Sequence, residues 1–180
     1  MEVKIGSSVL ELIQGDITQQ DTDAIVNAAN RTLLGGGGVD GAIHWAAGPE
    51  LLAECRTLGG CDTGDAVITR GYKLKAQYVI HTVGPVYQSS NPSTERLLES
   101  AYQRSLEVAL AKGIRSVAFP AISTGAYGYP LGEAASVALR TVIGFLQAHP
   151  EIKLVRFVLF NRRALEAFEE SLGRLNPAGS

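Results

Sequence analysis

Cysteine is scarce in this sequence, because the 180 residues include only Cys55 and Cys61. Two thiols do not complete the ligand set of a structural zinc site, and no further ligands follow them at zinc spacing. We therefore expect no metal site. A pair of cysteines in a reducing compartment is also more typical of free thiols than of a disulfide, so we expect both thiols to be free.

Long apolar runs and an excess of positive charge are also lacking. No stretch reaches the length of about 20 apolar residues that a transmembrane helix needs, so we expect no membrane partner. The segment Met1–Lys4 lacks the apolar region of a signal peptide, and we expect a cytoplasmic protein. The net charge of −2 provides no general attraction for nucleic acid, which we do not expect as the main partner.

The composition that remains is that of one compact globular domain. Apolar residues make up 46% of the chain and charged residues 19%, which is enough to form a sizeable core. The length is also typical of a single domain. We expect residues 1–175 to form this domain and residues 176–180 to be a loose C-terminal tail.

Strand and helix patterns alternate along the chain. The expected strands are Val3–Ile5, Val9–Gln14, Ala24–Ala28, Ala66–Arg70, Tyr78–Val83, Ser116–Phe119 and Leu154–Phe160. The expected helices are Val39–Ala47, Glu50–Leu58, a helix from Pro92 to about Lys112, Leu131–Ala148 and Ala164–Leu175. Helices between buried strands predict an α/β fold, a three-layer α/β/α sandwich around a mixed, mostly parallel sheet.

The segment Asp23–His44 combines a buried strand, an asparagine pair, the glycine run Gly35–Gly38 and a helix start. Unpaired N–H groups and the positive end of a helix dipole at such a point favour an anion. The run lacks the Lys-Ser/Thr of a Walker A loop, and no acidic strand end follows at the dinucleotide-binding distance. We therefore expect a phosphate or diphosphate cradle for a nucleotide-like ligand.

Other polar or glycine-rich segments also follow predicted strands. Ligands of such sheets bind outside the carboxyl ends of the strands, so these segments are expected to converge there. They are Gly15–Thr18, Asn27–Asn30, His81–Pro85, Pro120–Gly128 and Phe160–Asn161.

Several motifs in order carry a family resemblance: GDIT, DAIVNAAN, LLGGGGVDGAIH, CDTGDA, YVIHTVGP and AISTGAYGYP. From about Val9 to the final helix, the chain resembles macrodomains of the MacroD type, which include bacterial O-acetyl-ADP-ribose deacetylases. The resemblance implies a macrodomain fold that binds ADP-ribose. It also implies hydrolysis of ADP-ribosyl esters, either the acetyl ester of free ADP-ribose or ADP-ribose linked to protein carboxylates, with no cofactor.

The resemblance assigns the adenine end to three residues. It implies that Asp16 accepts from the adenine amino group, that the N–H of Ile17 faces a ring nitrogen, and that Phe160 lies against the base. Asp16 is equally typical of a helix N-cap or turn. Phe160 could instead be a core aromatic at a strand end. Asn27 is a candidate ligand contact or a buried carboxamide that bonds to loop backbone.

Two loops are candidates for the diphosphate. The resemblance implies that the N–H groups of Gly37, Gly38 and Val39 bind one side, and that a second loop closes over the other, with Tyr127 at the distal ribose. An ordinary strand-to-helix turn is the alternative for the second loop, whose small residues favour anion binding. The other candidates in that loop are Ser123, Thr124, Gly125 and Ala126.

The same resemblance places the chemistry at Asn30, Asp40 and Tyr127. Asn30 would bind the distal ribose, and Asp40 would orient or deprotonate a water beside the ester. Alternatively, a substrate phosphate holds the water while Asp40 positions the ribose. His44 shares a helix face with Asp40 and could support it, relay a proton, or simply be satisfied by packing.

The sequence leaves two functions open. Gly-x-Ser-x-Gly is absent and neither cysteine lies in a reactive motif, so we expect an activated water rather than a covalent nucleophile, and no metal. Asn30, Asp40 and the Tyr127 loop favour an enzyme, while a reader module that only binds ADP-ribose is the alternative. Trp45 stands where related proteins often carry a basic residue, and it either packs against Pro49 or lies partly exposed at the pocket edge.

Overall fold

One mixed sheet organises the described part of the chain, in the strand order β1–β2–β7–β6–β3–β5–β4. The computed structural model describes residues 1–175, so the tail expected at residues 176–180 lies outside the described residues. The strands are β1 Glu2–Ile5, β2 Ser8–Gln14, β3 Ala24–Ala28, β4 Ala66–Arg70, β5 Tyr78–Thr82, β6 Ser116–Phe119 and β7 Leu154–Leu159.

The centre of the sheet is parallel and both edges are antiparallel. Strands β2, β7, β6, β3 and β5 run in one direction, so their carboxyl ends share one edge. Strand β1 returns against β2 through a tight turn in which Gly6 has a φ of +62°, a conformation that favours glycine. Strand β4 runs antiparallel to β5.

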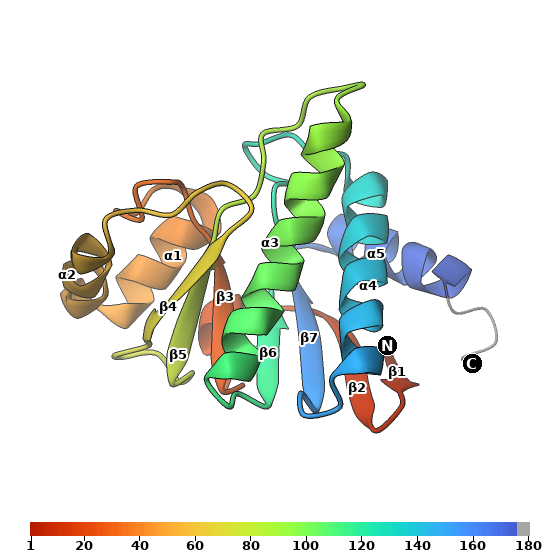
Figure 1. Cartoon of the computed structure of the whole chain (residues 1–180), viewed down its shortest axis with the longest axis horizontal. Coiled ribbons are helices and arrows are strands. Elements are labelled where there is room, and N and C mark those ends of the chain that lie inside the picture. Colours follow the sequence, from red (N-terminus) through yellow and green to blue (C-terminus); the bar gives the residue numbers. More distant parts are fainter. Residues whose placement is uncertain (176–180) are drawn as a thin grey trace.

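Helices cover both faces of the sheet (Figure 1). Helices α3 (Pro92–Ala111), α4 (Leu131–Ala148) and α5 (Arg162–Leu175) pack on one face, where they form the larger apolar core. Helices α1 (Gly38–Ala47) and α2 (Pro49–Leu58) pack on the other face with a smaller core. The predicted three-layer α/β/α sandwich with a mixed, mostly parallel sheet is confirmed.

Strand alternation assigns side chains to these two cores. In β5, Ile80 belongs to the larger core and Val79 to the smaller one, as the period of two in a strand requires. The larger core contains a row of aromatic rings. Phe157 lies 5.6 Å from Phe119 and 5.1 Å from Phe168, measured between ring centroids. Such pairs add about 0.5–1.5 kcal/mol each beyond their apolar burial.

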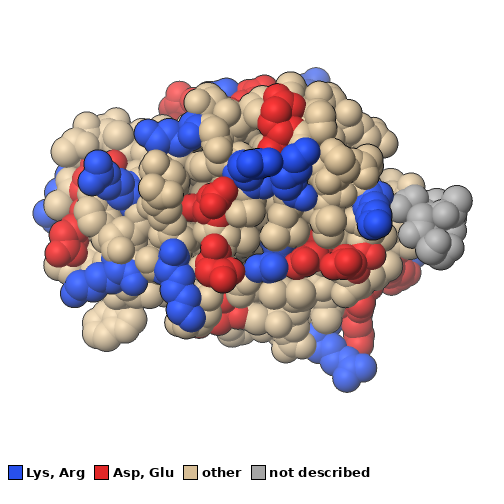
Figure 2. Space-filling view, turned by 90° about the horizontal axis from the view of Figure 1, so that it is seen from below, with Lys and Arg blue, Asp and Glu red and all other residues tan. Residues whose placement is uncertain are grey.

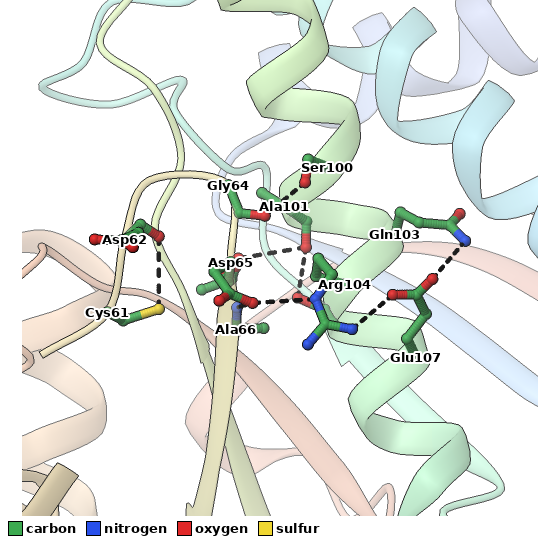
Figure 3. A network of polar contacts seen from close by, with 12 residues as sticks. Cys61, Asp62, Gly64, Asp65, Ala66, Ser100, Ala101, Gln103, Arg104 and Glu107 are labelled. Carbon is green, nitrogen blue, oxygen red and sulfur yellow. Dashed lines mark hydrogen bonds and ion pairs between the residues drawn. The ribbon is translucent and has the colours of Figure 1, made fainter.

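A polar network holds the start of edge strand β4 against α3 (Figure 3). Ser100 Oγ donates to the carbonyl of Gly64 at 2.7 Å, and Arg104 Nε lies 3.1 Å from Asp65 Oδ1. The backbone N–H of Ala66 and the Arg104 guanidinium lower the pKa of the Asp65 carboxyl. Because the charged groups are about half exposed, the ion pair stabilises the fold by no more than about 1 kcal/mol.

The differences from the predicted elements are small but fall near the carboxyl edge. A short 3₁₀ helix, η1 (Ile17–Gln19), was not predicted, and it forms because Asp16 caps it. Phe160 lies just beyond β7 rather than inside it. The antiparallel direction of β4 was also not predicted. Within residues 1–175, no helix is both long and apolar enough to cross a membrane.

Candidate functional site

The predicted rim segments follow the carboxyl ends of the five parallel strands, at the upper edge of the sheet in Figure 1. The segment after β2 lies beside the segment after β7, because Gly15 N–H donates to the carbonyl of Leu159 at 3.0 Å. The segment after β3 leads into the glycine run and α1. The loops after β5 and β6 contact each other, since Tyr87 N–H donates to the carbonyl of Tyr127 at 2.9 Å.

Asp16 and Phe160 are neighbours at one end of this rim, as the pairing of Gly15 with Leu159 requires. Phe160 is 84% exposed, so the alternative of a core aromatic is wrong. Asp16 Oδ1 accepts from both the N–H and the hydroxyl of Thr18, at 2.9 and 2.7 Å. Asp16 is therefore a cap, and among residues 1–175 its Oδ2 atom accepts no hydrogen bond. Asp16 is exposed as a residue, and its neighbour Phe160 follows the adjacent strand.

The glycine run leads into α1, and within residues 1–175 its N–H groups find no acceptor. Gly37 is the N-cap and forms no side-chain cap bond, while Gly38 begins α1 with a φ of +59°. The N–H groups in the first turn of a helix have no acceptor within that helix. At the N-terminus of α1 these groups are therefore available to a ligand. The glycines are also needed for space, because a methyl group on Gly41 would lie 2.4 Å from the carbonyl oxygen of Gly36.

The loop after β6 is held by its own hydrogen bonds. Ser123 Oγ donates to the carbonyl of Pro85 at 2.8 Å, and Thr124 Oγ1 donates to Ala121 at the same distance. Both hydroxyls are therefore occupied. Among residues 1–175, the N–H groups of Gly125 and Ala126 find no acceptor. In this loop, backbone donors are left for an anion, while the predicted hydroxyl donors bond to the backbone carbonyls of Pro85 and Ala121.

Ser123 adopts an unusual backbone conformation in this loop. Its φ is +70°, which costs a non-glycine residue free energy and is enriched at functional sites. Its carbonyl accepts from Tyr129 N–H at 2.9 Å, and its hydroxyl bond to Pro85 ties the loop to the segment after β5. These bonds hold Ser123 in the strained conformation and so define the path of the following residues to the half-buried Tyr127.

Asp40 lies in the first turn of α1 with a side chain only 6% exposed. Its Oδ1 atom accepts from Asn27 Nδ2 at 2.8 Å, and His44 Nε2 is 3.5 Å away. A methyl group built on Gly36 would lie 3.2 Å from Asp40 Oδ2 and 3.4 Å from Asn30 Nδ2. The structure therefore brings Asp40 and Asn30 together beside the glycine run, and Oδ2 is the carboxylate oxygen directed there.

Asn30 shapes the glycine run, a role that the sequence did not predict. Its Nδ2 donates to the carbonyl of Gly35 at 2.9 Å. Its Oδ1 accepts from the N–H and hydroxyl of Thr32, at 3.2 and 2.6 Å. An amide nitrogen has two hydrogens, so one remains for a ligand. The predicted contact of Asn30 with the distal ribose stays a prediction.

Asn27 lies one layer behind Asp40 and is fully buried in β3. Besides its bond to Asp40, its Nδ2 lies 3.1 Å from His81 Nδ1. The sequence-based alternative of a structural carboxamide fits this placement, although its partners are side chains rather than loop backbone. His81 is also fully buried, and its Nε2 lies 2.9 Å from Thr69 Oγ1 and 3.8 Å from Cys55 Sγ. Sequence reasoning missed Thr69, because nothing in its own segment marks it.

Burial sets the protonation of this polar group. Burial, and then the neighbouring His44, lower the pKa of His81 to about 3, so its ring is neutral at neutral pH. Burial raises the pKa of Cys55 to about 11, with smaller contributions from Glu54 and Asp40. Cys55 is thus a protonated packing thiol and has no nucleophilic character.

The lowered pKa of His81 predicts a pH-dependent stability. An unfolded histidine titrates near 6.5, so below about pH 6.5 the unfolded chain binds a proton that the folded one excludes until about pH 3. The free energy of unfolding should therefore fall with decreasing pH, by up to about 1.4 kcal/mol per pH unit from this group. Above pH 6.5 both states are neutral and the contribution is constant.

Urea unfolding of the wild type and of His81→Asn, at several pH values between 7.5 and 5.5, measures this dependence. The variant should show the flatter profile. The other two histidines, His44 and His149, are present in both proteins, so the difference between the two profiles reports His81. Parallel profiles would contradict a neutral, buried His81.

Two further predictions concern Trp45 and a metal site. Trp45 is 90% exposed on α1, so the alternative of packing against Pro49 is wrong. Within the described residues 1–175, no group of three or more His, Cys, Asp or Glu side chains is placed to hold a metal ion.

The fold and this rim define an α/β protein with an uncapped helix start that carries a buried carboxylate in its first turn, and with an exposed aromatic on the same rim. The chain belongs to the Macro domain family, whose profile matches residues 26–138. It is 52% identical to an O-acetyl-ADP-ribose deacetylase of Salmonella typhimurium, over 92% of this chain and 95% of that protein. It is 51% identical to the ADP-ribose glycohydrolase MACROD2 of Xenopus laevis, over 98% of this chain but only 43% of that protein.

Solved structures agree with this assignment. A mutant macrodomain of Oceanobacillus iheyensis with ADPR has a TM-score of 0.95 and 45% sequence identity, and the match covers 98% of both chains. The predicted macrodomain family and fold are therefore confirmed. The roles predicted for individual site residues stay predictions.

Proposed function

We propose that this protein binds ADP-ribose along the rim and hydrolyses ADP-ribosyl esters with an activated water. The observation that carries the proposal is the uncapped start of α1, with the Asp40 carboxylate in its first turn and Asn30 beside that carboxylate. Unpaired N–H groups suit a diphosphate, and a carboxylate next to that site suits chemistry on the adjoining sugar. The named deacetylase and glycohydrolase relatives support the same reading.

The binding residues follow from position along the rim. Phe160 offers an exposed aromatic face to the adenine, and the free Oδ2 of Asp16 can accept from its amino group. The diphosphate then lies between the N–H groups at Gly37–Val39 and those at Gly125 and Ala126. Tyr127 and Asn30 lie on the side of the distal ribose.

The chemistry requires one water and one carboxylate. Water adds to the acyl carbon of the ester, the bond from that carbon to the ribose oxygen breaks, and the ribose hydroxyl takes a proton. Asp40 Oδ1 is held by Asn27, so Oδ2 is the atom that can orient the water or accept its proton. A diphosphate oxygen of the substrate could hold the same water, in which case Oδ2 positions the ribose.

Release of ADP-ribose tests the proposal. The two substrates are O-acetyl-ADP-ribose and a protein mono-ADP-ribosylated on glutamate, each assayed with a chelator present. Turnover of either supports an ester hydrolase, and their ratio shows which leaving group it accepts. Tight ADP-ribose binding by calorimetry without turnover would contradict the enzyme and indicate a reader module.

Mono-ADP-ribosylated proteins are the macromolecular partners that this function implies. Nucleic acid fits less well, because a strand needs a continuous basic groove. On the face opposite the rim, seen in Figure 2, basic and acidic side chains are interspersed rather than gathered by sign.

The adenine assignment predicts a selective effect of Phe160→Ala. Because the ring is 84% exposed, its removal should leave the free energy of unfolding nearly unchanged. Affinity for ADP-ribose should fall by about 1–3 kcal/mol, the range for stacking of a base on an aromatic ring. Affinity for ribose 5-phosphate should not change, and calorimetry with both ligands measures the contrast.

Trp45→Ala is the matched control, since it removes another exposed aromatic, from α1 rather than from the end of β7. It should leave both affinities unchanged. Equal weakening of the two ligands by Phe160→Ala would remove Phe160 from the adenine site.

A further inference from the structure

A buried chain of hydrogen bonds leads from the backbone of β4 to the carboxylate of Asp40. Thr69 Oγ1 donates to the carbonyl of Arg70 at 3.1 Å and lies 2.9 Å from His81 Nε2. His81 Nδ1 lies 3.1 Å from Asn27 Nδ2, which in turn lies 2.8 Å from Asp40 Oδ1. Four of the five residues are at most 4% exposed, so water does not compete for these bonds.

The carbonyl at one end fixes the direction of the whole chain. Thr69 has a single hydroxyl hydrogen, and the Arg70 carbonyl can only accept it. Thr69 Oγ1 must then accept from His81, which places the proton of the neutral ring on Nε2. His81 Nδ1 is left as an acceptor, and it receives a hydrogen from Asn27 Nδ2.

The Asn27 amide depends on these contacts because its other end has none. Its Oδ1 atom is buried and, among the described residues, has no hydrogen-bond partner. Among residues 1–175, the two hydrogens on Nδ2 are therefore the only polar contacts of the amide, one to His81 and one to Asp40. Without an acceptor at residue 81, a single bond would hold the amide, and its rotation would direct Oδ1 toward the carboxylate.

We propose that His81 is a positioning residue for Asp40, acting through the Asn27 amide. The proposal rests on the proposed function, because it is for that reaction that the Asp40 carboxylate needs a defined orientation. His81 keeps the donor side of Asn27 directed at Asp40 Oδ1, which leaves Oδ2 directed toward Gly36 and Asn30. The lowered pKa of His81 supports this role, since a protonated ring could not accept from Asn27.

The first test needs no turnover. In protein with ¹⁵N-labelled histidine, the ring nitrogens of His81 should show the neutral tautomer with the proton on Nε2, unchanged from pH 8 to pH 5.5. A proton on Nδ1 would overturn the proposal, because that nitrogen could not then accept from Asn27. This measurement does not depend on activity. If the protein shows the expected tautomer but no turnover, the proposed hydrolysis is contradicted, while the hydrogen-bond chain is not.

The second test separates positioning from stability. His81→Leu should lower kcat on the order of tenfold or more, since a misplacement of about 1 Å can cost up to about a hundredfold. Its affinity for ADP-ribose should stay unchanged. His81→Asn should recover part of kcat, because the asparagine Oδ1 can take the place of Nδ1 as an acceptor. Val79→Ala is the control: it cuts a buried side chain on the same face of β5 and should destabilise the fold with kcat unchanged.

A double variant tests the route through Asn27. If His81 acts only on the amide, then His81→Leu should lower kcat no further in an Asn27→Ala background. Independent, multiplicative losses would overturn the proposal, as would a Val79→Ala variant that loses as much kcat as His81→Leu at equal stability.

Discussion

Asp40→Asn is expected to lower kcat for ADP-ribosyl esters by about a hundredfold or more, while ADP-ribose still binds with nearly the wild-type affinity. The substitution removes the charge that would orient or deprotonate the water, a contribution of about 10²–10⁴-fold in general acid–base catalysis. It preserves shape, and the new amide oxygen can still accept from Asn27 Nδ2. Steady-state kinetics and calorimetry on the same preparation measure the two effects.

Asp40→Ala should differ from the asparagine variant in stability. It leaves the buried Nδ2 of Asn27 with one acceptor fewer, which costs about 1–3 kcal/mol in the free energy of unfolding. Asp62→Asn, at an 86% exposed side chain, is the control for loss of a negative charge. Equal losses of affinity and turnover in Asp40→Asn would make Asp40 a binding residue rather than the catalytic one.

Gly41→Ala should damage the diphosphate site without touching the ligand. The new methyl group would lie 2.4 Å from the carbonyl oxygen of Gly36. The oxygen belongs to the backbone and the methyl group is attached directly to the backbone, so neither can rotate away as a flexible side chain would. The glycine run must shift, so its N–H groups no longer converge on the anion. We expect at least about a tenfold loss of ADP-ribose affinity, or ~1.4 kcal/mol. Overpacking should also cost about 1–3 kcal/mol of stability.

Gly144→Ala provides the matched control in another helix. A methyl group there meets no atom within 4 Å, and alanine is the better helix former. This variant should bind ADP-ribose as the wild type does and unfold at slightly higher urea. If Gly41→Ala also bound normally, the position of the glycine run would not determine diphosphate affinity.

Local sequence patterns predicted most of the fold. The bounds of β3, β4, β6 and α4 match their predicted ranges, because each is a short apolar run or an amphipathic stretch between strong turn signals. Helix α3 begins at Pro92 as predicted, and Asn91 caps it. The direction of β4 was not predictable in this way, since strand direction depends on pairing with β5 and not on the pattern of β4 itself.

The sequence named the residues of the candidate site one by one, but it did not predict the hydrogen bonds between them. The motifs place Asp16 and Phe160 directly after a recognisable strand, and the glycine run and Asp40 at the helix start that follows β3. The exposure of Phe160 agrees with that placement. The occupied hydroxyl of Ser123 was not predicted. It donates to a residue 38 positions away in sequence, and no local pattern carries such information.

The sequence by itself determined the family, the succession of strands and helices, and the set of polar residues at the carboxyl edge, because these depend on local periodicity and ordered motifs. Only the tertiary structure decided how those residues support one another. Asn27, Asp40 and His81 come from β3, α1 and β5, and their hydrogen bonds exist because parallel pairing places Asn27 opposite His81 while α1 packs on the same face. That register is set by the burial of whole strands, which no single motif encodes.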